Sequence, residues 1–375
     1  MKIGYIAKNI PLPGFKENPI IINQAKLIMD SKDYDVEIYY PNEIIPPLLL
    51  SLIPNHLGQR LKKSALQKNI FKVSNISIKK INYIRFFFNS HLEWLAIKYC
   101  NFNLSDDIVL NHAHFVFPDG LIAYNLYKKK NIPYVLTIRE GDFINYNKNY
   151  FNKKLMLKII NDASAIISLT YSLEEKIKFL NSKAPVYRIG NFIDNDFFQP
   201  LNKTTKNDRA IISVVANFIP RKNIEWIIEY HNSNRTFDLI ICGDGSENNI
   251  LRKMANSEIK FTGYLSKEKI IDVLDRSDIF VLPSQNETFG LVYIEAAARK
   301  NIVVGIKNTG IYEPNIEGFF FAQDKANFFE ILDSILKLPK DRLNILKNAA
   351  YKHALNFRED IIRDKLLDLY KASVG

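Results

Sequence analysis

Short β-branched runs alternate with amphipathic helical segments along the whole chain. This alternation is typical of parallel sheets whose strands are joined by helical crossovers. In the first half the predicted strands are Ile3–Ala7, Val36–Tyr40, Ile108–Asn111, Tyr134–Ile138, Ala165–Leu169 and Val186–Ile189. In the second half they are Ile211–Ala216, Phe237–Cys242, Ile259–Thr262, Ile279–Pro283, Ile302–Gly305 and Phe319–Phe321.

A polar stretch, Asn202–Arg209, divides these strands into two sets, and 375 residues are more than one ordinary domain holds. We therefore expect an α/β protein of two Rossmann-like domains whose parallel sheets face a central cleft, where ligands bind. The expected bounds are 1–195 for the first domain, 196–209 for a linker and 210–355 for the second domain. A helix over 356–375 follows, and the sequence leaves open whether it returns to the first domain.

The composition is that of a soluble globular protein, with 47% hydrophobic and 24% charged residues. Cys100 and Cys242 are far apart, which argues against a disulfide scaffold or a zinc ribbon. The most apolar window, Ile44–Pro54, has eleven residues and three prolines, whereas a spanning helix needs roughly 20 apolar residues. Because the chain also opens without a signal-peptide pattern, we expect it to be cytoplasmic or peripheral on the inner face of the plasma membrane.

Positive charge is concentrated in Ile44–Cys100, where nine Lys or Arg accompany one acid, Glu93. This segment therefore carries +8 of the net charge of +11. Aromatic residues are interleaved with the basic ones: Phe71, Tyr83, Phe86, Phe87, Phe88 and Trp94. The combination suits an anionic surface, and we favour a membrane over nucleic acid. The alternative is an ordinary solvated basic face.

The stretch NETFGLVYIEAAA places Glu287 and Glu295 on either side of the expected start of a helix near Gly290. The free amides of Gly290, Leu291 and Val292 and the helix dipole favour an anion there, and glycine lets a diphosphate approach the backbone. A carboxylate would repel that anion, so each glutamate should accept hydrogen bonds from hydroxyls. Glu295 lies one turn, roughly 6 Å, along the helix, which suits a ribose diol. The alternative is that both glutamates are structural.

This second half resembles the donor domain of glycosyltransferase family 4, the retaining enzymes of the GT-B fold. The element E-x7-E matches Glu287 and Glu295, and three further segments match in order: ICGDGSE with Gly243, FTGY with Tyr264 and NTGIYE with Gly310 and Glu313. The resemblance implies that Glu295 binds ribose, that Glu287 contacts the transferred sugar, and that the loop of Thr288, Phe289, Gly290 and Leu291 holds the diphosphate. It also places the base near Tyr264.

A basic pair accompanies these segments in the family. In VANFIPRKNIEWII, Lys222 occupies the lysine position, while Asn217 stands where the family has arginine, and the neighbouring Arg221 is the candidate replacement. A cation beside the departing diphosphate is the expected electrostatic contribution to catalysis. The alternative is that Arg221 and Lys222 are solvated residues at a helix start.

The first half resembles the same family less closely. In HAHFVFPDG the residues His112 and His114 follow a predicted strand, and His114 is a candidate catalytic residue. In IPYVLTIREGDF, Asp142 fits the family pattern, but Arg139 replaces its histidine. His112, Arg139 and Asp142 are assigned to the acceptor side, and Gly14, in the loop after the first strand, to the donor. Lone histidines are otherwise most often structural.

The resemblance implies a retaining, metal-independent hexosyltransferase with no cofactor. Its domains would bind the acceptor (1–195) and the nucleotide sugar (210–355). Its co-substrate would be a UDP- or GDP-sugar. The basic, aromatic segment of the first domain suits an acceptor that is a lipid-linked or cell-surface glycan precursor, such as those of polysaccharide or lipopolysaccharide. Three alternatives are a metal-dependent GT-A transferase using Asp194 and Asp196, a sugar-nucleotide epimerase of similar fold, and an inactive membrane-surface binding protein.

Overall fold

The computed structural model describes residues 1–12, 19–44, 68–84, 90–146, 150–201, 209–285, 287–307 and 310–374. The chain divides into two compact units. The first unit consists of Met1–Leu169, Leu173–Ile189 and Arg363–Gly375, and the second of Thr170–Ser172 and Gly190–Ile362. The division thus falls at Ile189–Gly190 rather than after residue 195, and residues 202–208 of the expected linker lie outside the described ranges.

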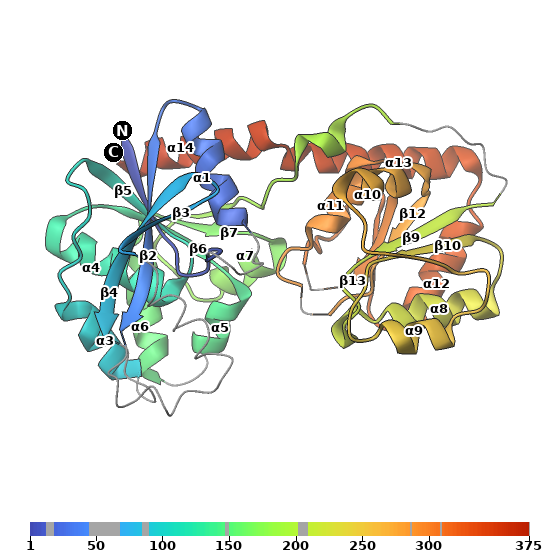
Figure 1. Ribbon diagram of the computed structural model, residues 1–375, viewed down its shortest axis with the longest axis horizontal. Helices are drawn as coiled ribbons and strands as arrows, with labels where there is room; N and C mark the ends of the chain where they lie inside the picture. The colour runs from blue at the N-terminus through green and yellow to red at the C-terminus, as the bar shows by residue number, and fades with distance from the viewer. Residues whose placement is uncertain are drawn as a thin grey trace. The chain divides into compact units, whose positions relative to one another are not determined.

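The first unit contains a sheet with the strand order β3-β4-β2-β1-β5-β6-β7-β8 in its described part (Figure 1). Neighbouring strands are parallel except β3 and β4, which form an antiparallel hairpin. The strands are β1 (Lys2–Ile6), β2 (Asp35–Ile44), β3 (Ile70–Val73), β4 (Ile76–Ile84), β5 (Ile108–Ala113), β6 (Tyr134–Ile138), β7 (Ala165–Ser168) and β8 (Val186–Arg188).

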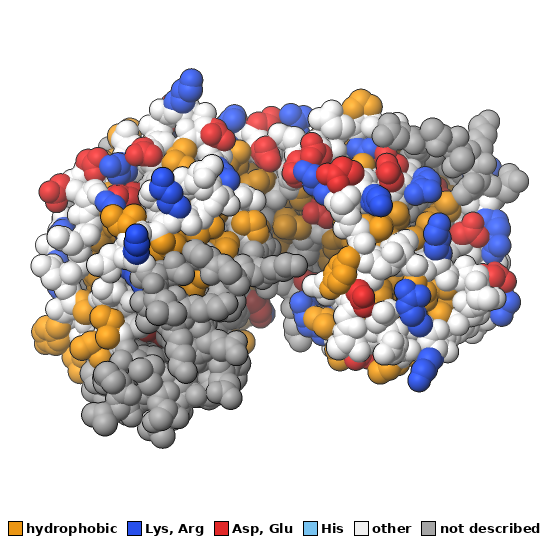
Figure 2. Space-filling model, viewed as in Figure 1, with side chains coloured by type: hydrophobic (Ala, Val, Ile, Leu, Met, Phe, Trp, Pro, Cys, Tyr) orange, Lys and Arg blue, Asp and Glu red, His pale blue; other side chains and the backbone are white. Residues whose placement is uncertain are grey.

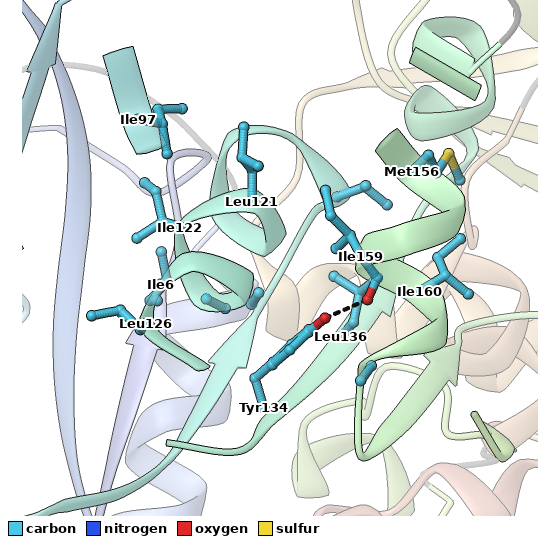
Figure 3. Close-up of a cluster of buried hydrophobic side chains, with 14 of the residues drawn as sticks. Ile6, Ile97, Leu121, Ile122, Leu126, Tyr134, Leu136, Met156, Ile159 and Ile160 are labelled. Atoms are coloured by element: carbon cyan, nitrogen blue, oxygen red, sulfur yellow. Dashed lines mark hydrogen bonds between the residues drawn. The ribbon is translucent and has the colours of Figure 1, made fainter. Parts of the chain in front are cut away.

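Helices alternate with these strands: α1 (Ile20–Asp30), α3 (Ser90–Tyr99), the π-helix η2 (Val116–Gly120), α4 (Leu121–Lys130), α5 (Glu140–Tyr146), α6 (Tyr150–Asn161), α7 (Tyr171–Lys178) and α14 (Glu359–Val374). Figure 3 shows the buried cluster in which α4 and α6 meet β6. Tyr134 is wholly buried there, and its hydroxyl donates to the backbone oxygen of Ile159, which satisfies the polar end of an otherwise apolar side chain.

The second unit contains a parallel sheet with the order β11-β10-β9-β12-β13-β14 in its described part (Figure 1). This is the Rossmann order, whose direction reverses between β9 and β12. The strands are β9 (Ile211–Val215), β10 (Asp238–Cys242), β11 (Lys260–Gly263), β12 (Ile279–Val281), β13 (Ile302–Ile306) and β14 (Phe319–Ala322).

The helices of the second unit, with its short 3-10 turns, are η3 (Asn195–Phe198), η4 (Pro220–Lys222), α8 (Ile224–Ser233), α9 (Asn248–Met254), α10 (Lys267–Arg276), α11 (Leu291–Ala298), α12 (Lys325–Leu336), α13 (Lys340–Ala354) and η5 (Leu355–Phe357). The guanidinium of Arg299 is buried, pairs with Asp275 and donates to the backbone oxygens of Phe197, Gln199 and Pro200. These bonds tie the segment around η3 to the second unit.

All twelve predicted strands are present, but the hairpin of β3 and β4 was not predicted. It lies within the segment interpreted as a basic, aromatic surface, and that interpretation is wrong for Phe71 and Tyr83, which are 7% and 1% exposed. In β4 the residues Ile76, Ile78 and Ile81 are buried, and the residues that directly follow Ile76 and Tyr83 are exposed. Buried and exposed positions therefore alternate as they do in a strand, although the segment is rich in lysine. Within the described ranges, no helix combines the length and hydropathy needed to cross a membrane.

Candidate functional site

The candidate site lies in the second unit, at the carboxyl ends of β9 and β12. These strands are neighbours in the sheet and flank the point where its order reverses, which is where open parallel sheets bind ligands. Their two following loops are bonded together. The amide of Gln285 donates to the backbone oxygen of Arg221 at 2.8 Å, and Asn223 Nδ2 donates to that of Pro283 at 2.8 Å. This pairing holds the basic loop after β9 against the acidic loop after β12.

The carboxylate of Glu287 is the centre of this pair of loops. Its Oε1 accepts hydrogen bonds from Arg221 Nη1 at 2.9 Å, from Ser284 Oγ at 2.7 Å and from Lys222 Nζ. Burial opposes ionisation, but the hydrogen bonds from Lys222 and Ser284 outweigh it, so the pKa of Glu287 is lowered from its usual value. The structure thus brings together three of the predicted residues and adds Ser284. The sequence offered one signal for Ser284, which is its position at a strand end three residues before Glu287.

The fold itself requires glycine at position 290. Gly290 precedes α11 with φ of +82°, and a Cβ there would lie 2.6 Å from ring carbons of Tyr293. Tyr293 cannot easily move, because its ring is buried and its hydroxyl donates to the backbone oxygen of Leu282 at 2.7 Å. Access of a phosphate to the backbone is therefore not needed to explain this glycine. Gly290 and Leu291 are half-buried and Thr288 is exposed, so this loop end is open.

Phe289, one of the residues assigned to the donor, has its side chain in the interior of the second unit. Phe289 is only 4% exposed, and its ring packs edge to face on that of Phe357, with centroids 5.7 Å apart. A Cβ at Gly190 would lie 2.8 Å from the same ring. Phe289 is therefore part of the packing of the second unit. The backbone of the loop before Phe289 is fixed by Gly310, whose amide donates to the backbone oxygen of Glu287 at 2.9 Å.

The carboxyl group of Glu295 lies one turn inside α11 and is half-buried. Burial, and to a smaller extent the charge of Asp194, raise its pKa to about 7. Asp194 and Asp196 are themselves bonded to Lys267 Nζ. Within the described part of the chain, the Glu295 carboxyl has no hydrogen-bond partner. It is thus a carboxyl group with unused hydrogen-bonding capacity near the start of the helix.

The loops after β10 and β11 complete this edge of the sheet. Gly243 has φ of +133°, and a Cβ there would lie 1.8 Å from the backbone oxygen of Ala216, so the loops after β9 and β10 touch. The side chain of Tyr264 is 69% exposed. Its hydroxyl is 3.4 Å from Asn217 Oδ1 and 3.3 Å from the backbone oxygen of Asp244. Asn217 therefore faces Tyr264, and its uncharged amide leaves Arg221 as the second cation beside Lys222.

His112 does not belong to an acceptor site. Contrary to expectation, β5 continues to Ala113, and His112 lies within it, wholly buried in the first unit. Its Nδ1 is 2.7 Å from the hydroxyl of Tyr370, and its Nε2 is 2.8 Å from Thr137 Oγ1. Burial lowers its pKa to about 3, so the ring is neutral. His112 therefore joins α14 to the sheet.

His114 and Asp142 are also interior groups of the first unit. His114 is 1% exposed and stacks on His112 with ring centroids 4.1 Å apart, and burial lowers its pKa well below the usual value. Asp142 is 1% exposed, and its two oxygens accept from the amides of Val116, at 3.0 Å, and Arg139, at 2.9 Å. Arg139 Nε donates to the backbone oxygen of His114 at 3.2 Å. Asp142 and Arg139, both assigned to the acceptor side, thus bind the surrounding backbone instead.

Two polar atoms of this interior keep unused hydrogen-bonding capacity. Neither His114 Nε2 nor Asp119 Oδ2 has a hydrogen-bond partner among the described residues. Asp119 is wholly buried, which raises its pKa well above the usual value, and its Oδ1 accepts from the amide of Lys8 at 3.1 Å. Both lie after β5, and Lys8 follows β1, so they mark the reversal point of the first sheet. Sequence reasoning missed Asp119 and Lys8, and Gly14 lies outside the described residues.

Comparison with known proteins agrees with this fold. A family model described as glycosyl transferases group 1 matches residues 196–353. An uncharacterized glycosyltransferase of Methanocaldococcus jannaschii is 24% identical over 243 residues, which cover 62% of this chain and 66%, slightly less than two thirds, of that protein. The N,N'-diacetylbacillosaminyl-diphospho-undecaprenol alpha-1,3-N-acetylgalactosaminyltransferase of Campylobacter jejuni is 25% identical over 345 residues, 83% of this chain and 87% of that enzyme.

Among solved structures, HepE of Anabaena in complex with UDP matches with a TM-score of 0.67 and 14% identity over 99% of this chain and 100% of that chain. At this identity the likeness shows the fold alone, and it confirms the GT-B architecture of two parallel sheets predicted from sequence. The part of this chain that matches the glycosyl transferases of group 1 is thus residues 196–353, which hold the candidate site.

Proposed function

We propose that this protein is a retaining, metal-independent hexosyltransferase that moves a sugar from a UDP- or GDP-sugar to a hydroxyl acceptor. The observation that carries the proposal is the convergence of Arg221, Lys222 and Ser284 on Glu287, beside the start of α11. Two cations and a helix N-terminus on one loop pair suit a diphosphate. Family 4 among the group 1 enzymes fits these residues.

In this proposal Glu287 holds the two cations in place until the donor arrives. The diphosphate then takes over Arg221 and Lys222, and Glu287 turns to a hydroxyl of the transferred sugar. Glu295 accepts from the ribose diol, since its carboxyl group has no other partner among the described residues. Tyr264 offers its exposed ring to the base.

The chemical step follows from this assignment. The bond between the anomeric carbon and the diphosphate oxygen breaks, and a bond to the acceptor oxygen forms on the same face. The acceptor proton passes to the departing diphosphate oxygen. A double-displacement reaction would need two carboxylates about 5–5.5 Å apart across the sugar. In this proposal Glu287 accepts from a sugar hydroxyl instead of attacking the sugar, and the charges of Arg221 and Lys222, which pair with Glu287 before the donor binds, stabilise the leaving diphosphate.

We assign the acceptor to the first unit and propose that it is lipid-linked or a cell-surface glycan precursor, presented at a membrane. The name of the Campylobacter relative includes a diphospho-undecaprenol compound, which supports this class. In the first unit, Asp119 Oδ2 and His114 Nε2 offer two buried polar atoms with no partner among the described residues, after the strand that borders β1. We place the acceptor at this edge of the first sheet, where its strand order reverses.

A thermal-shift panel of UDP-, GDP- and ADP-sugars tests the proposal on the wild type, on Glu295→Ala and on Glu330→Ala. Glu330 is an exposed glutamate of α12 and serves as the matched control. One nucleotide class should stabilise the wild type and the control, and Glu295→Ala should lose the shift. Absence of any shift with all three classes would refute donor binding. Conversion of the sugar without any acceptor would indicate an epimerase instead.

A further inference from the structure

Three helices of the first unit, α3, α4 and α6, border a groove of about 270 Å³. Its lining residues are Trp94, Tyr124, Phe151, Lys154, Leu155 and Lys158. The rings of Trp94 and Phe151 meet edge to face with centroids 5.9 Å apart. Trp94, Tyr124 and Phe151 are partly buried and pack on the hydrophobic core of the unit. The floor of the groove is therefore aromatic and packed on the core.

The charge around this groove is positive. Lys154 and Lys158 are exposed, and neither forms an ion pair with any described residue. Lys98 Nζ lies 5.0 Å from the centroid of the Trp94 ring. No carboxylate lines the groove in the described part of the chain, and nearby Asp162 is bonded to Lys128 at 2.6 Å. An anion approaching the floor thus meets lysines whose charge is not already neutralised.

Large apolar side chains are exposed on the same helices. Tyr150, at the start of α6, is 78% exposed, and on α3 the side chain of Tyr99 is 75% and that of Leu95 36% exposed. Figure 2 shows hydrophobic side chains gathered at the lower left edge of the first unit, where Figure 1 places α3 and α4. Aromatic rings with a polar end, beside lysines with long apolar stems, are suited to the interfacial layer of a bilayer.

We propose that this groove docks the protein on an anionic membrane. The phosphate of an anionic phospholipid lies against Lys154 and Lys158, and Trp94, Phe151 and Tyr150 contact the glycerol region and upper acyl chain. The groove is smaller than the 300–1,000 Å³ of usual ligand pockets, so it fits part of one lipid rather than a whole acceptor. The inference rests on the proposed function, since it supplies the membrane contact that a lipid-linked acceptor needs.

The chain has two tryptophans, so Trp226→Phe leaves Trp94 as the single indole reporter. In this background, vesicles containing phosphatidylglycerol should shift the emission of Trp94 to shorter wavelength, and brominated phosphatidylglycerol should quench it. Vesicles of phosphatidylcholine alone should do neither. Each lysine near an anionic surface contributes about a fivefold gain in partition, so Lys154→Gln/Lys158→Gln should weaken binding about 25-fold. Tyr150→Ser should weaken it less, with the lysine charge intact.

The matched control is Lys253→Gln/Lys352→Gln, which removes the same charge from exposed positions of the second unit and should bind vesicles as the wild type does. Equal losses in both double variants would overturn the proposal, and so would vesicle binding that leaves Trp94 emission unchanged. Millimolar inorganic phosphate that reproduces the emission shift without lipid would also overturn it. Nucleotide-sugar thermal shifts of the same variants are measured without lipid, so failure of donor binding is scored separately.

Discussion

Lys222 and Glu287 form an ion pair in which each side chain is only 12% exposed. They lie 65 residues apart in the sequence and on the loops after two neighbouring strands. Removing one member of such a pair leaves a poorly hydrated charge, which costs more than the pair contributes. Lys222 is therefore suited to exchanging the Glu287 carboxylate for another anion, whereas the loss of any anionic partner would be costly.

Replacing Lys222 with glutamine should lower the transfer rate at saturating donor by about 10²–10³-fold. The leaving diphosphate would then lose the less exposed of the two cations that stabilise its negative charge. Lys325→Gln removes an equal charge from a pair with Glu229 elsewhere in the second unit and should leave the rate unchanged. Steady-state kinetics with each purified variant measure the difference. A Lys222→Gln enzyme with wild-type turnover would contradict the assignment.

Glu287→Gln should separate binding from transfer. It removes the negative charge that competes with a diphosphate for Arg221 and Lys222, so UDP or GDP should bind about tenfold more tightly. The transfer rate should nevertheless fall, since the sugar loses its charged partner. Calorimetry with the nucleotide diphosphate and turnover with the nucleotide sugar give the two quantities. Weaker binding of the diphosphate would argue against competition.

Arg221→Gln tests whether this arginine replaces the one absent at Asn217. Its loss should weaken donor binding and lower the transfer rate by about tenfold, as expected for one exposed charge-assisted contact. Adding Asn217→Arg to Arg221→Gln should restore part of the loss, because a guanidinium then returns to the same edge of the sheet. If the double variant is no better than the single one, the two positions are not equivalent.

Gly290→Ala should destabilise the second unit more than Gly263→Ala. Both glycines have positive φ, +82° and +72°, but a Cβ at Gly263 has no atom within 4 Å, whereas one at Gly290 meets the Tyr293 ring at 2.6 Å. The backbone conformation alone should cost about 1–2 kcal/mol at either site, and the clash adds to it only at Gly290. Urea unfolding of both variants gives the difference. Equal losses would mean that Tyr293 moves freely.

Glu295 should make the protein less stable as pH rises from about 4.5 to 7. Its folded pKa, about 7, lies above its unfolded value, so the folded state binds more protons in that window and loses stability on their release. Each unit of the difference is worth about 1.4 kcal/mol. Glu295→Gln should flatten the slope. Asp142, with pKa also about 7, adds a slope of the same sign that should persist in the variant.

Much of the fold was readable from local pattern. Strands such as β9 and β12 are short β-branched runs whose period needs no distant information. The hairpin of β3 and β4 was missed because three lysines, Lys72, Lys79 and Lys80, interrupt its apolar positions. The histidines were misplaced because the sequence shows that His112 and His114 come at the end of an apolar run. It does not show that the strand continues through His112 and that the buried ring of His112 lies 2.7 Å from the Tyr370 hydroxyl.

Three of the residues predicted for the donor site contact one another in the structure, but the task of each residue was not readable from the sequence. Glu287, Arg221 and Lys222 meet, as expected for one site, whereas Phe289 turns inward to Phe357. Ser284 was overlooked because a serine at a strand end is common. Its place in the site follows only from the hydrogen bond of 2.7 Å that its hydroxyl donates to Glu287.

By itself, the sequence determined the strands, the helices and the segments that carry acids, cations and glycines, because these follow from the chemistry of neighbouring residues. Only the tertiary structure decided which of those side chains meet. The reversal of strand order between β9 and β12 sets two distant loops side by side, and burial then determines which polar groups keep hydrogen-bonding capacity for a ligand. Contacts of this kind depend on the whole sheet, so no local pattern contains them.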